Sequence, residues 1–215
     1  MQCCAVPCND TNRFFSRLAG FYRWRFRVFG FEKTQKQLLK GVLDAGVERA
    51  SIMEIGCGAG HLHRKLLEHG AASATGVDIS QNMLDQARRL SAESALAERT
   101  RYHHGDYADL AGELDDADIM IMDKVVCCYP DPERLLKAAL PKTRRVVALT
   151  YPRDRVYTRL GVAVAAKMMK LLGSDFRPYV HSPDDIRQWI TQQGFALLHF
   201  NSVFAWQTEV YQRDL

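Results

Sequence analysis

Along most of the chain, short apolar runs alternate with stretches in which apolar residues recur every three or four positions. The short runs predict buried strands, which cover residues 51–55, 74–77, 101–104, 118–122 and 146–151. The helical spacing, together with capping residues and helix-ending glycines or prolines, predicts helices between and beside these strands, at residues 33–45, 61–69, 80–94, 131–141, 154–172 and 182–193. Strands and helices therefore alternate along the sequence.

The chain ends with two further predicted strands, at residues 195–200 and 204–210, which are close enough in sequence to pair as an antiparallel hairpin. Alternation followed by such a hairpin predicts an α/β fold: a doubly wound, mostly parallel, seven-stranded sheet with helices on both faces. We expect one domain over residues 1–215, with an N-terminal helical lid over 1–45 and the core of the fold over 46–215.

Composition narrows the class of protein. The 215 residues are 47% hydrophobic, which is typical of globular proteins, and apolar stretches such as residues 161–166 fall far short of the roughly 20 residues of a membrane span. The N-terminus has neither the basic nor the apolar region of a secretory signal. Six cysteines are few for a disulfide scaffold of this length, so we expect a reducing, cytoplasmic location.

A glycine-rich turn follows the first strand of the core, at Gly56, Gly58 and Gly60. In a doubly wound sheet, ligands bind beyond the carboxyl ends of the strands, and glycines there allow a sharp turn and a close approach of the ligand. A dinucleotide fold requires G-x-G-x-x-G, but His61 stands where its last glycine belongs, which disfavours an NAD-dependent oxidoreductase. Taken alone, the turn could also be a simple chain reversal.

Acidic residues follow the next three strands of the core. Asp78 ends the strand at 74–77 and could accept hydrogen bonds from both hydroxyls of a ribose. Asp106 and Asp123 follow later strands at the same edge of the predicted sheet. Each has a plainer alternative, since Asp78 could cap the helix that starts near Ser80 and Asp106 could cap a short turn.

Together, the E-x-G-x-G-x-G sequence of residues 54–60, V-D-I-S-Q-N-M-L at 77–84, G-D-Y at 105–107 and the acid at 123 resemble the motifs of class I S-adenosylmethionine-dependent methyltransferases. The resemblance is strong over residues 50–150. It implies S-adenosyl-L-methionine as the cofactor, and it implies the cofactor-binding residues Glu54, Gly56, Gly58, Gly60, Asp78, Ile79, Met83, Asp106, Tyr107 and Asp123.

The resemblance also implies a role for individual residues. Asp78 would bind the ribose, Ile79 would pack on the adenine, and Asp106 would accept a hydrogen bond from the adenine amino group. Glu54 would lie near the amino group of the cofactor, either in contact with it or holding the loop. Asp123 would line the methionine and substrate side of the pocket.

Methyl transfer mainly requires that cofactor and acceptor be held in line. A hydroxyl or amine acceptor would benefit from a general base, whereas a carboxylate needs none. The candidates are Tyr129, in the loop after the fourth strand, and His181, ahead of the helix at 182. Tyr129 could equally pack against Pro130, and His181 could be a polar loop residue, so no base is assigned.

The cysteines do not predict a metal site. Cys127 and Cys128 would point in opposite directions on an extension of the strand, which is poor geometry for binding one ion. Cys3, Cys4 and Cys8 contain no C-x-x-C pair. We expect no metal and interpret Cys127 and Cys128 as small buried residues.

The charge of the chain is unevenly distributed. The formal net charge is +4, yet residues 13–40 carry +7 and the remainder −3, and residues 14–31 hold eight of the 21 aromatic residues. We expect this segment to cover the pocket as a lid whose arginines and aromatic rings bind a flat or apolar acceptor that bears an anionic group. The alternative is an amphipathic segment with its aromatic rings packed on the sheet and its arginines solvated.

The sequence therefore predicts a methyltransferase that acts on a small acceptor, anionic or partly apolar. The N-terminal helices and Tyr129-Pro130 resemble those of magnesium-protoporphyrin O-methyltransferases, but no feature assigns that substrate. Three alternatives stay open: a non-catalytic S-adenosylmethionine-binding protein, an RNA-directed methyltransferase, and peripheral membrane contact through the N-terminus and the helix at 162–172. The mild net charge argues against nucleic acid, and the sequence leaves the oligomeric state open.

Overall fold

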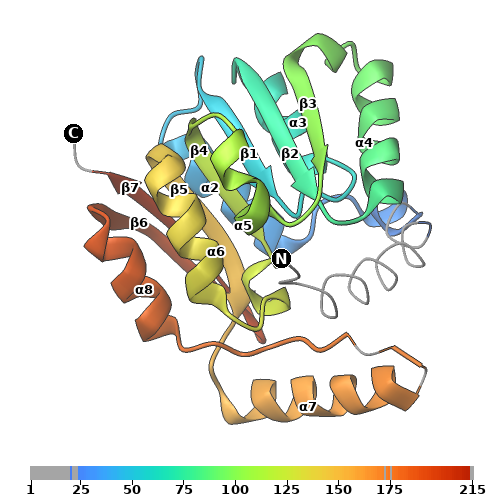
Figure 1. Cartoon of the computed structure of the whole chain (residues 1–215), viewed down its shortest axis with the longest axis vertical. Helices are drawn as coiled ribbons and strands as arrows, with labels where there is room; N and C mark the ends of the chain where they lie inside the picture. The colour runs from blue at the N-terminus through green and yellow to red at the C-terminus, as the bar shows by residue number, and fades with distance from the viewer. Residues whose placement is uncertain (1–19, 21–23, 172, 175, 214–215) are drawn as a thin grey trace.

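The computed structural model describes residue 20 and residues 24–171, 173–174 and 176–213. Seven strands form one sheet in the order β3-β2-β1-β4-β5-β7-β6 (Figure 1). The strands are β1 (Ser51–Ile55), β2 (Ser73–Asp78), β3 (Thr100–His104), β4 (Ala117–Asp123), β5 (Thr143–Pro152), β6 (Phe195–Ser202) and β7 (Trp206–Arg213). The first five are parallel, and β7 is antiparallel to both β5 and β6, which confirms the predicted topology.

Helices cover both faces of the sheet. On one face, α2 (Lys33–Asp44) and α3 (His61–Glu68) contribute to a buried core cluster, and on the other, α5 (Tyr107–Leu110), α6 (Pro132–Ala139) and α8 (Pro183–Gln192) contribute to a second. The helix α4 (Gln81–Glu93) packs against β2 and β3. The helix α7 (Val156–Leu171) lies apart from both layers, beyond the carboxyl ends of the strands (Figure 1).

Two local features differ from the sequence expectation. The strand β5 begins at Thr143 rather than Val146, because β4 begins at Ala117 and pairs with it there. A short helix, α5, follows β3, and the Asp106 side chain caps it by accepting a hydrogen bond from the backbone N–H of Ala108 at 3.0 Å. In the described part of the chain, no helix has the length and apolar character needed to cross a bilayer.

A buried carboxylate joins α8 to the strands β5 and β7. Glu209 on β7 is fully buried and accepts hydrogen bonds from Arg187 Nε at 2.9 Å and Nη2 at 2.6 Å. The Tyr151 hydroxyl donates to the same carboxylate at 2.9 Å, and Tyr211 donates to it as well. Burial, followed by the charge of Glu209, raises the pKa values of both tyrosines, which stay neutral donors. A buried charge is tolerated because every neighbour here donates to it.

Arg187→Ala should reduce the free energy of unfolding by roughly 3 kcal/mol, because removal of one partner leaves an uncompensated buried charge. Urea denaturation at neutral pH measures the change. The control is Lys137→Ala, which breaks the exposed pair with Glu133 on α6 and should cost no more than about 0.5 kcal/mol. Equal effects of the two substitutions would contradict the role given to Glu209.

Candidate functional site

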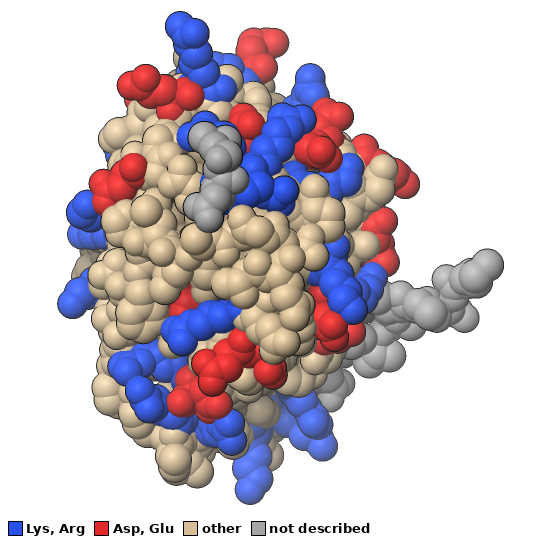
Figure 2. All heavy atoms as spheres, turned by 90° about the vertical axis from the view of Figure 1, so that its left-hand side faces the viewer, with Lys and Arg blue, Asp and Glu red and all other residues tan. Residues whose placement is uncertain are grey.

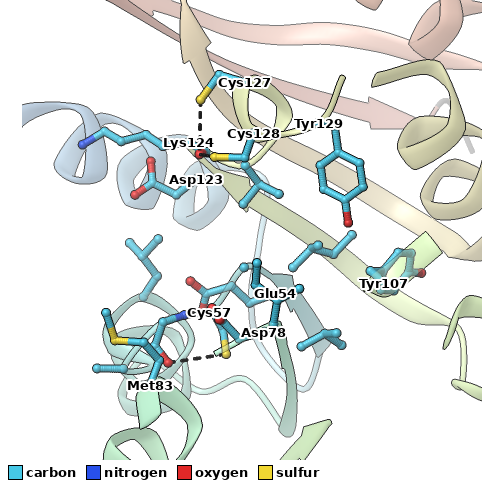
Figure 3. Close-up of a pocket in the computed structure, with 18 of the residues that line it drawn as sticks. Glu54, Cys57, Asp78, Met83, Tyr107, Asp123, Lys124, Cys127, Cys128 and Tyr129 are labelled. Atoms are coloured by element: carbon cyan, nitrogen blue, oxygen red, sulfur yellow. Dashed lines mark hydrogen bonds between the residues drawn. The ribbon is translucent and has the colours of Figure 1, made fainter. Parts of the chain in front are cut away.

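The order of the strands reverses at β1, because β2 and β3 lie on one side of it and β4 and β5 on the other. Connections from β1 and β4 leave on opposite faces of the sheet, so a crevice opens between their carboxyl ends. A cavity of about 680 Å³ lies there, lined by residues that follow β1, β2, β3 and β4 and by residues of the N-terminal helices. Figure 3 shows part of its wall.

The three glycines of the turn after β1 have different roles. Gly56 has a φ of +63°, and a Cβ on it would lie 2.4 Å from Val125 Cγ2, so this position lets the loops after β1 and β4 touch. Gly58 has a φ of +52° and nothing within 4 Å of its missing Cβ, which leaves that space to the cavity. Gly60 caps α3 and does not line the cavity; a Cβ there would meet the His63 ring at 2.7 Å.

The side chain of Glu54 is held by contacts with the helix α3. It is buried on β1, and its Oε2 contacts both the backbone N–H of His63 at 3.2 Å and His63 Nδ1 at 2.5 Å. His63 Nε2 is 3.0 Å from the Tyr102 hydroxyl, which lies 2.7 Å from Ser91 Oγ. Glu54 also lines the cavity. Through these contacts Glu54 holds the first turn of α3, by way of a histidine that no sequence motif singled out.

Asp78 joins two backbone segments at the mouth of the cavity. Its Oδ2 accepts from the Gly58 N–H at 2.8 Å and its Oδ1 from the Ser80 N–H at 2.8 Å. The contact with Ser80 closes a tight turn just before α4, whose N-cap is Ser80 itself, so Asp78 is not the helix cap that the plainer alternative proposed. The Asp78 side chain also faces the cavity. Burial raises the pKa of Asp78 to about 6, despite the two backbone hydrogen bonds that lower it. Ile79 and Met83, from the following turn and α4, line the same side of the cavity.

Asp106 is more heavily engaged than expected. Besides capping α5, it accepts from the hydroxyl of Tyr129 and from Arg134 Nη1 at 3.2 Å. These contacts tie together the segments after β3 and β4 and the helix α6. Asp106 and the buried Tyr107 both line the cavity, so the position expected to meet the adenine is part of the wall, but its carboxylate already serves a structural purpose.

The two carboxylate oxygens of Asp123 differ in their hydrogen bonds. Gln35 Nε2 on α2 donates to its Oδ2 at 3.0 Å, whereas Oδ1 is buried and has no hydrogen-bond partner among the described residues. Burial raises the pKa of Asp123. Asp123 lines the cavity together with Glu54 and Asp78. A buried oxygen without a partner on a cavity wall is a place where a ligand donor would be satisfied.

Lys124 anchors the N-terminal helices to the loop after β4. It has a φ of +60°, which is rare for a residue with a side chain and marks a strained loop. Its Nζ pairs with Glu32, whose other oxygen pairs with Arg25, and it lies 5.3 Å from the ring centroid of Trp206. Burial acts to raise the pKa of Glu32, but the two cations outweigh burial and lower it.

Residues 24–29 form a helix beside the cavity. The Phe26 ring stacks on His61 with centroids 3.5 Å apart, and Arg25 and Phe26 both line the cavity. Burial, then the nearby Arg64, lowers the pKa of His61 to about 4, so it stacks as a neutral ring. The rest of the basic aromatic segment, including Arg23, lies outside the described residues.

The described residues fit the alternative arrangement of this segment in part, since Phe26 and Phe31 pack against the rest of the molecule and Arg27 is exposed. Trp24 and Phe29 are exposed, whereas Arg25 faces the cavity. The helical backbone explains the difference, because it turns alternate residues to different sides of its axis rather than sorting them onto two faces.

Cys127 is buried as expected and Cys128 is partly buried, but the expectation that the two side chains point in opposite directions is wrong. They lie on a single turn of 3₁₀-helix rather than on a strand extension, so their thiols do not diverge. Both contact the carbonyl oxygen of Lys124, at 3.4 and 3.5 Å (Figure 3). Cys57, Cys127 and Cys128 are free thiols in the cavity wall, and the described residues contain no cluster of three or more metal-ligating side chains.

The two candidate bases occupy different places. Tyr129 lines the cavity, but its hydroxyl donates to Asp106. His181 does not line the cavity; its Nε2 lies 2.9 Å from the Tyr129 carbonyl oxygen. Burial lowers the pKa of His181. The geometry places His181 as a support for the Tyr129 loop.

Several residues that line the cavity belong to no motif that would have predicted their place there. Gln35 reaches Asp123 across 88 positions in sequence, and the far wall is formed by residues from the C-terminal half, namely Met169, Phe176, Pro178 and Trp206. No motif surrounds these residues, so only the folded chain brings them to the site.

Comparisons with known proteins agree with this geometry. A family model described as a methyltransferase domain matches residues 52–148. The structure of magnesium protoporphyrin IX methyltransferase from Synechocystis PCC 6803 with bound SAH is similar to this chain, with a TM-score of 0.70 and 23% identity, over 97% of this chain and 100% of that one. No protein in a search of curated sequences matches significantly.

Other similar structures come from diverse methyltransferases. A putative sarcosine dimethylglycine methyltransferase from Galdieria sulphuraria aligns with a TM-score of 0.71 and 13% identity, over 93% of this chain and 98% of that one. A putative RNA methyltransferase from Pyrococcus horikoshii aligns with a TM-score of 0.61 and 15% identity, over 84% and 83%. These likenesses establish the fold, and the family model covers the segment with the glycine turn and the acids after β2, β3 and β4. The match of residues 52–148 to a methyltransferase domain, together with the fold, supports the class I S-adenosylmethionine-dependent methyltransferase superfamily for this chain.

Proposed function

We propose that this protein transfers the methyl group of S-adenosylmethionine to a small, partly apolar acceptor held between the lid and the loop after β4. The observation that carries the proposal is the cavity at the β1–β4 switch point, where Gly58 leaves open space beside the Asp78 carboxylate. S-Adenosylmethionine supplies an activated methyl group on a sulfonium. Free thiols in the cavity wall favour a reducing compartment such as the cytoplasm.

The residues of the cavity fit this cofactor. A ribose placed beside Gly58 would present its hydroxyls to Asp78, whose oxygens each retain capacity to accept a further hydrogen bond. The orphaned Asp123 Oδ1 offers an acceptor for the ammonium group or for the methyl acceptor. Ile79 and Met83 supply an apolar surface for the adenine. All of the proposed cofactor residues except Gly60 line the cavity.

The acceptor side of the cavity is mainly apolar and aromatic. Phe26, Met169, Phe176, Pro178 and Trp206 line it. The cations of the cavity wall are already paired. Arg25 and Lys124 both pair with Glu32. Arg134 pairs with Asp106 and Asp109. An anionic group on the acceptor would therefore compete with Glu32. This favours an acceptor that is apolar over most of its surface.

An RNA acceptor receives little support from the described residues. The cavity cations are paired with acids, and the face of the molecule in Figure 2 carries Lys and Arg interspersed with Asp and Glu rather than one basic area. Phosphate binding depends on cations that are free to replace counterions. A screen of small-molecule pools and of RNA with methyl-labelled cofactor tests the proposal. Label in a small apolar product supports it, whereas label in RNA alone, or none, contradicts it.

Binding of the cofactor product S-adenosylhomocysteine should weaken about tenfold for each pH unit below 6. The carboxylate of Asp78 is the form that accepts from ribose hydroxyls, and burial raises the pKa of Asp78 to about 6, so protonation competes with binding below that pH. Isothermal titration calorimetry from pH 7.5 down to pH 5 measures the change.

Asp78→Asn should bind the product more weakly at pH 7.5, by about 1.5 to 3 kcal/mol, and should lose most of the pH dependence. The matched control is Asp85→Asn on the exposed face of α4, which should leave both properties unchanged. Affinity that stays constant between pH 7.5 and 5 in the unmodified protein would remove Asp78 from the binding site.

Phe26→Ala should raise the KM of the acceptor at least about fivefold, because it removes a partly buried ring from the cavity wall, and should change the affinity for S-adenosylhomocysteine less than twofold. Steady-state kinetics with the acceptor from the screen, and calorimetry with the product, separate the two effects. Phe29→Ala, an exposed ring in the same helix that does not line the cavity, is the control. If Phe26→Ala weakens product binding as much as acceptor use, the lid does not select the acceptor.

A further inference from the structure

The helix α7 exposes a continuous apolar stripe. Val156, Leu160, Val164, Met168 and Leu171 recur at intervals of four, four, four and three residues and so lie on one side of the helix. Their exposed fractions are 75%, 63%, 58%, 58% and 86%, and Thr158 is the one residue of α7 that is buried. Solvent exposure of so many large apolar residues on one helix marks an interaction site.

An aromatic pair extends this stripe beyond the helix. Tyr157 stacks on Phe204, from the turn between β6 and β7, with ring centroids 4.6 Å apart and planes at 22°. The Tyr157 hydroxyl donates to the Phe204 carbonyl at 2.7 Å, which fixes the pair. Phe204 is 77% exposed. Rings with an apolar body and a polar tip are suited to the boundary between water and lipid.

The charge beside the stripe is positive. Residues 155–171 contain Arg155, Arg159, Lys167 and Lys170 and no acid. Arg159 is neutralised by Asp154, at 2.5 and 2.7 Å, whereas Lys167 and Lys170 are exposed and form no ion pair within the described part of the chain. An apolar stripe flanked by lysines complements a surface that is both apolar and anionic.

We propose that the stripe of α7 and the Tyr157–Phe204 pair dock the protein on the surface of an anionic lipid bilayer, with α7 lying in the plane of the interface. Such helices bury an apolar face at the boundary of headgroups and acyl chains and gain further affinity from anionic lipids. The proposal rests on the exposed face of α7 and not on the identity of the acceptor.

Other occupants fit the stripe less well. Nucleic acid is bound by cations and stacking rings, whereas the stripe consists of Val, Leu and Met side chains. In a two-fold dimer each stripe would meet its own copy, and the lysines of both copies would gather at one contact with no acid from α7 to pair with them. The bilayer alone satisfies both the apolar and the cationic part of the surface.

Docking there would also place the cavity near the bilayer. Met169 lines the cavity from the inner side of α7, and Phe176 and Pro178 line it from the segment that follows. The exposed stripe lies on the opposite side of the same helix, as the helical spacing of its residues relative to Met169 requires. A partly apolar acceptor dissolved in the lipid would then reach the cavity beside α7 without crossing bulk water.

Vesicle co-sedimentation of the full chain tests the proposal. The probes are vesicles of phosphatidylcholine alone and of phosphatidylcholine mixed with phosphatidylglycerol. Binding to the mixed vesicles should be about tenfold tighter. The triple variant Leu160→Ser, Val164→Ser, Met168→Ser should lose at least about tenfold in affinity for the mixed vesicles. Lys167→Gln with Lys170→Gln should remove most of the preference for phosphatidylglycerol.

The matched control is Leu197→Ser with Leu198→Ser, which removes two half-exposed leucines from the edge strand β6 and should leave vesicle binding unchanged. An unchanged thermal unfolding temperature shows that the variants are folded. S-Adenosylhomocysteine binding, measured separately, reports on the proposed function and should not change in the triple variant.

Two outcomes would overturn the proposal. One is the absence of binding to either vesicle by the folded, unmodified chain. The other is an oligomer in sedimentation equilibrium that the triple variant converts to a monomer while vesicle binding stays unchanged, because the stripe would then be a contact between copies of the chain.

Discussion

The position of β1 between β2 and β4 is the constraint on which the rest of the site depends. Strand pairing brings the loops after β1 and β4 together so closely that Gly56 has no room for a Cβ beside Val125. Because the crevice opens at this point, Gly58 can face open space and Asp78, from the neighbouring strand, can accept its N–H. The acids after β2, β3 and β4 share one cavity since parallel strands end at the same edge of the sheet.

Three acidic residues, Glu32, Asp106 and Glu209, each hold a small group of paired side chains. Glu32 holds Arg25 and Lys124, Asp106 holds Tyr129 and Arg134, and Glu209 holds Arg187 with two tyrosines. The first two groups fasten separate segments around the cavity, and the third fastens α8 to the sheet. Pairing of this kind occupies the cations Arg25, Lys124 and Arg134 of the cavity wall, so the wall offers mainly apolar contact to an acceptor.

The cavity and the exposed stripe of α7 are two sides of one element. Most amphipathic helices in such a fold turn their apolar face to the sheet, as α2 and α6 do. In α7 the apolar residues continue around the outer side, and the inner side reaches the cavity rather than the core. The helix α7 contributes little to the core, yet it has apolar residues on both sides. Contact with another molecule or surface best explains its exposed apolar residues.

Patterns along the chain predicted the sheet, its hairpin and the resemblance to methyltransferases, because strand patterns and turn motifs are local in sequence. They also predicted that the segments after β1, β2, β3 and β4 meet, because parallel strands end at one edge of the sheet. Tertiary structure alone decided what these residues touch: His63 behind Glu54, Gln35 on Asp123, and Tyr129 with Arg134 on Asp106. It also turned the thiols of Cys127 and Cys128 to one side. These contacts join side chains from different elements, whose relative positions follow from packing and not from spacing along the chain.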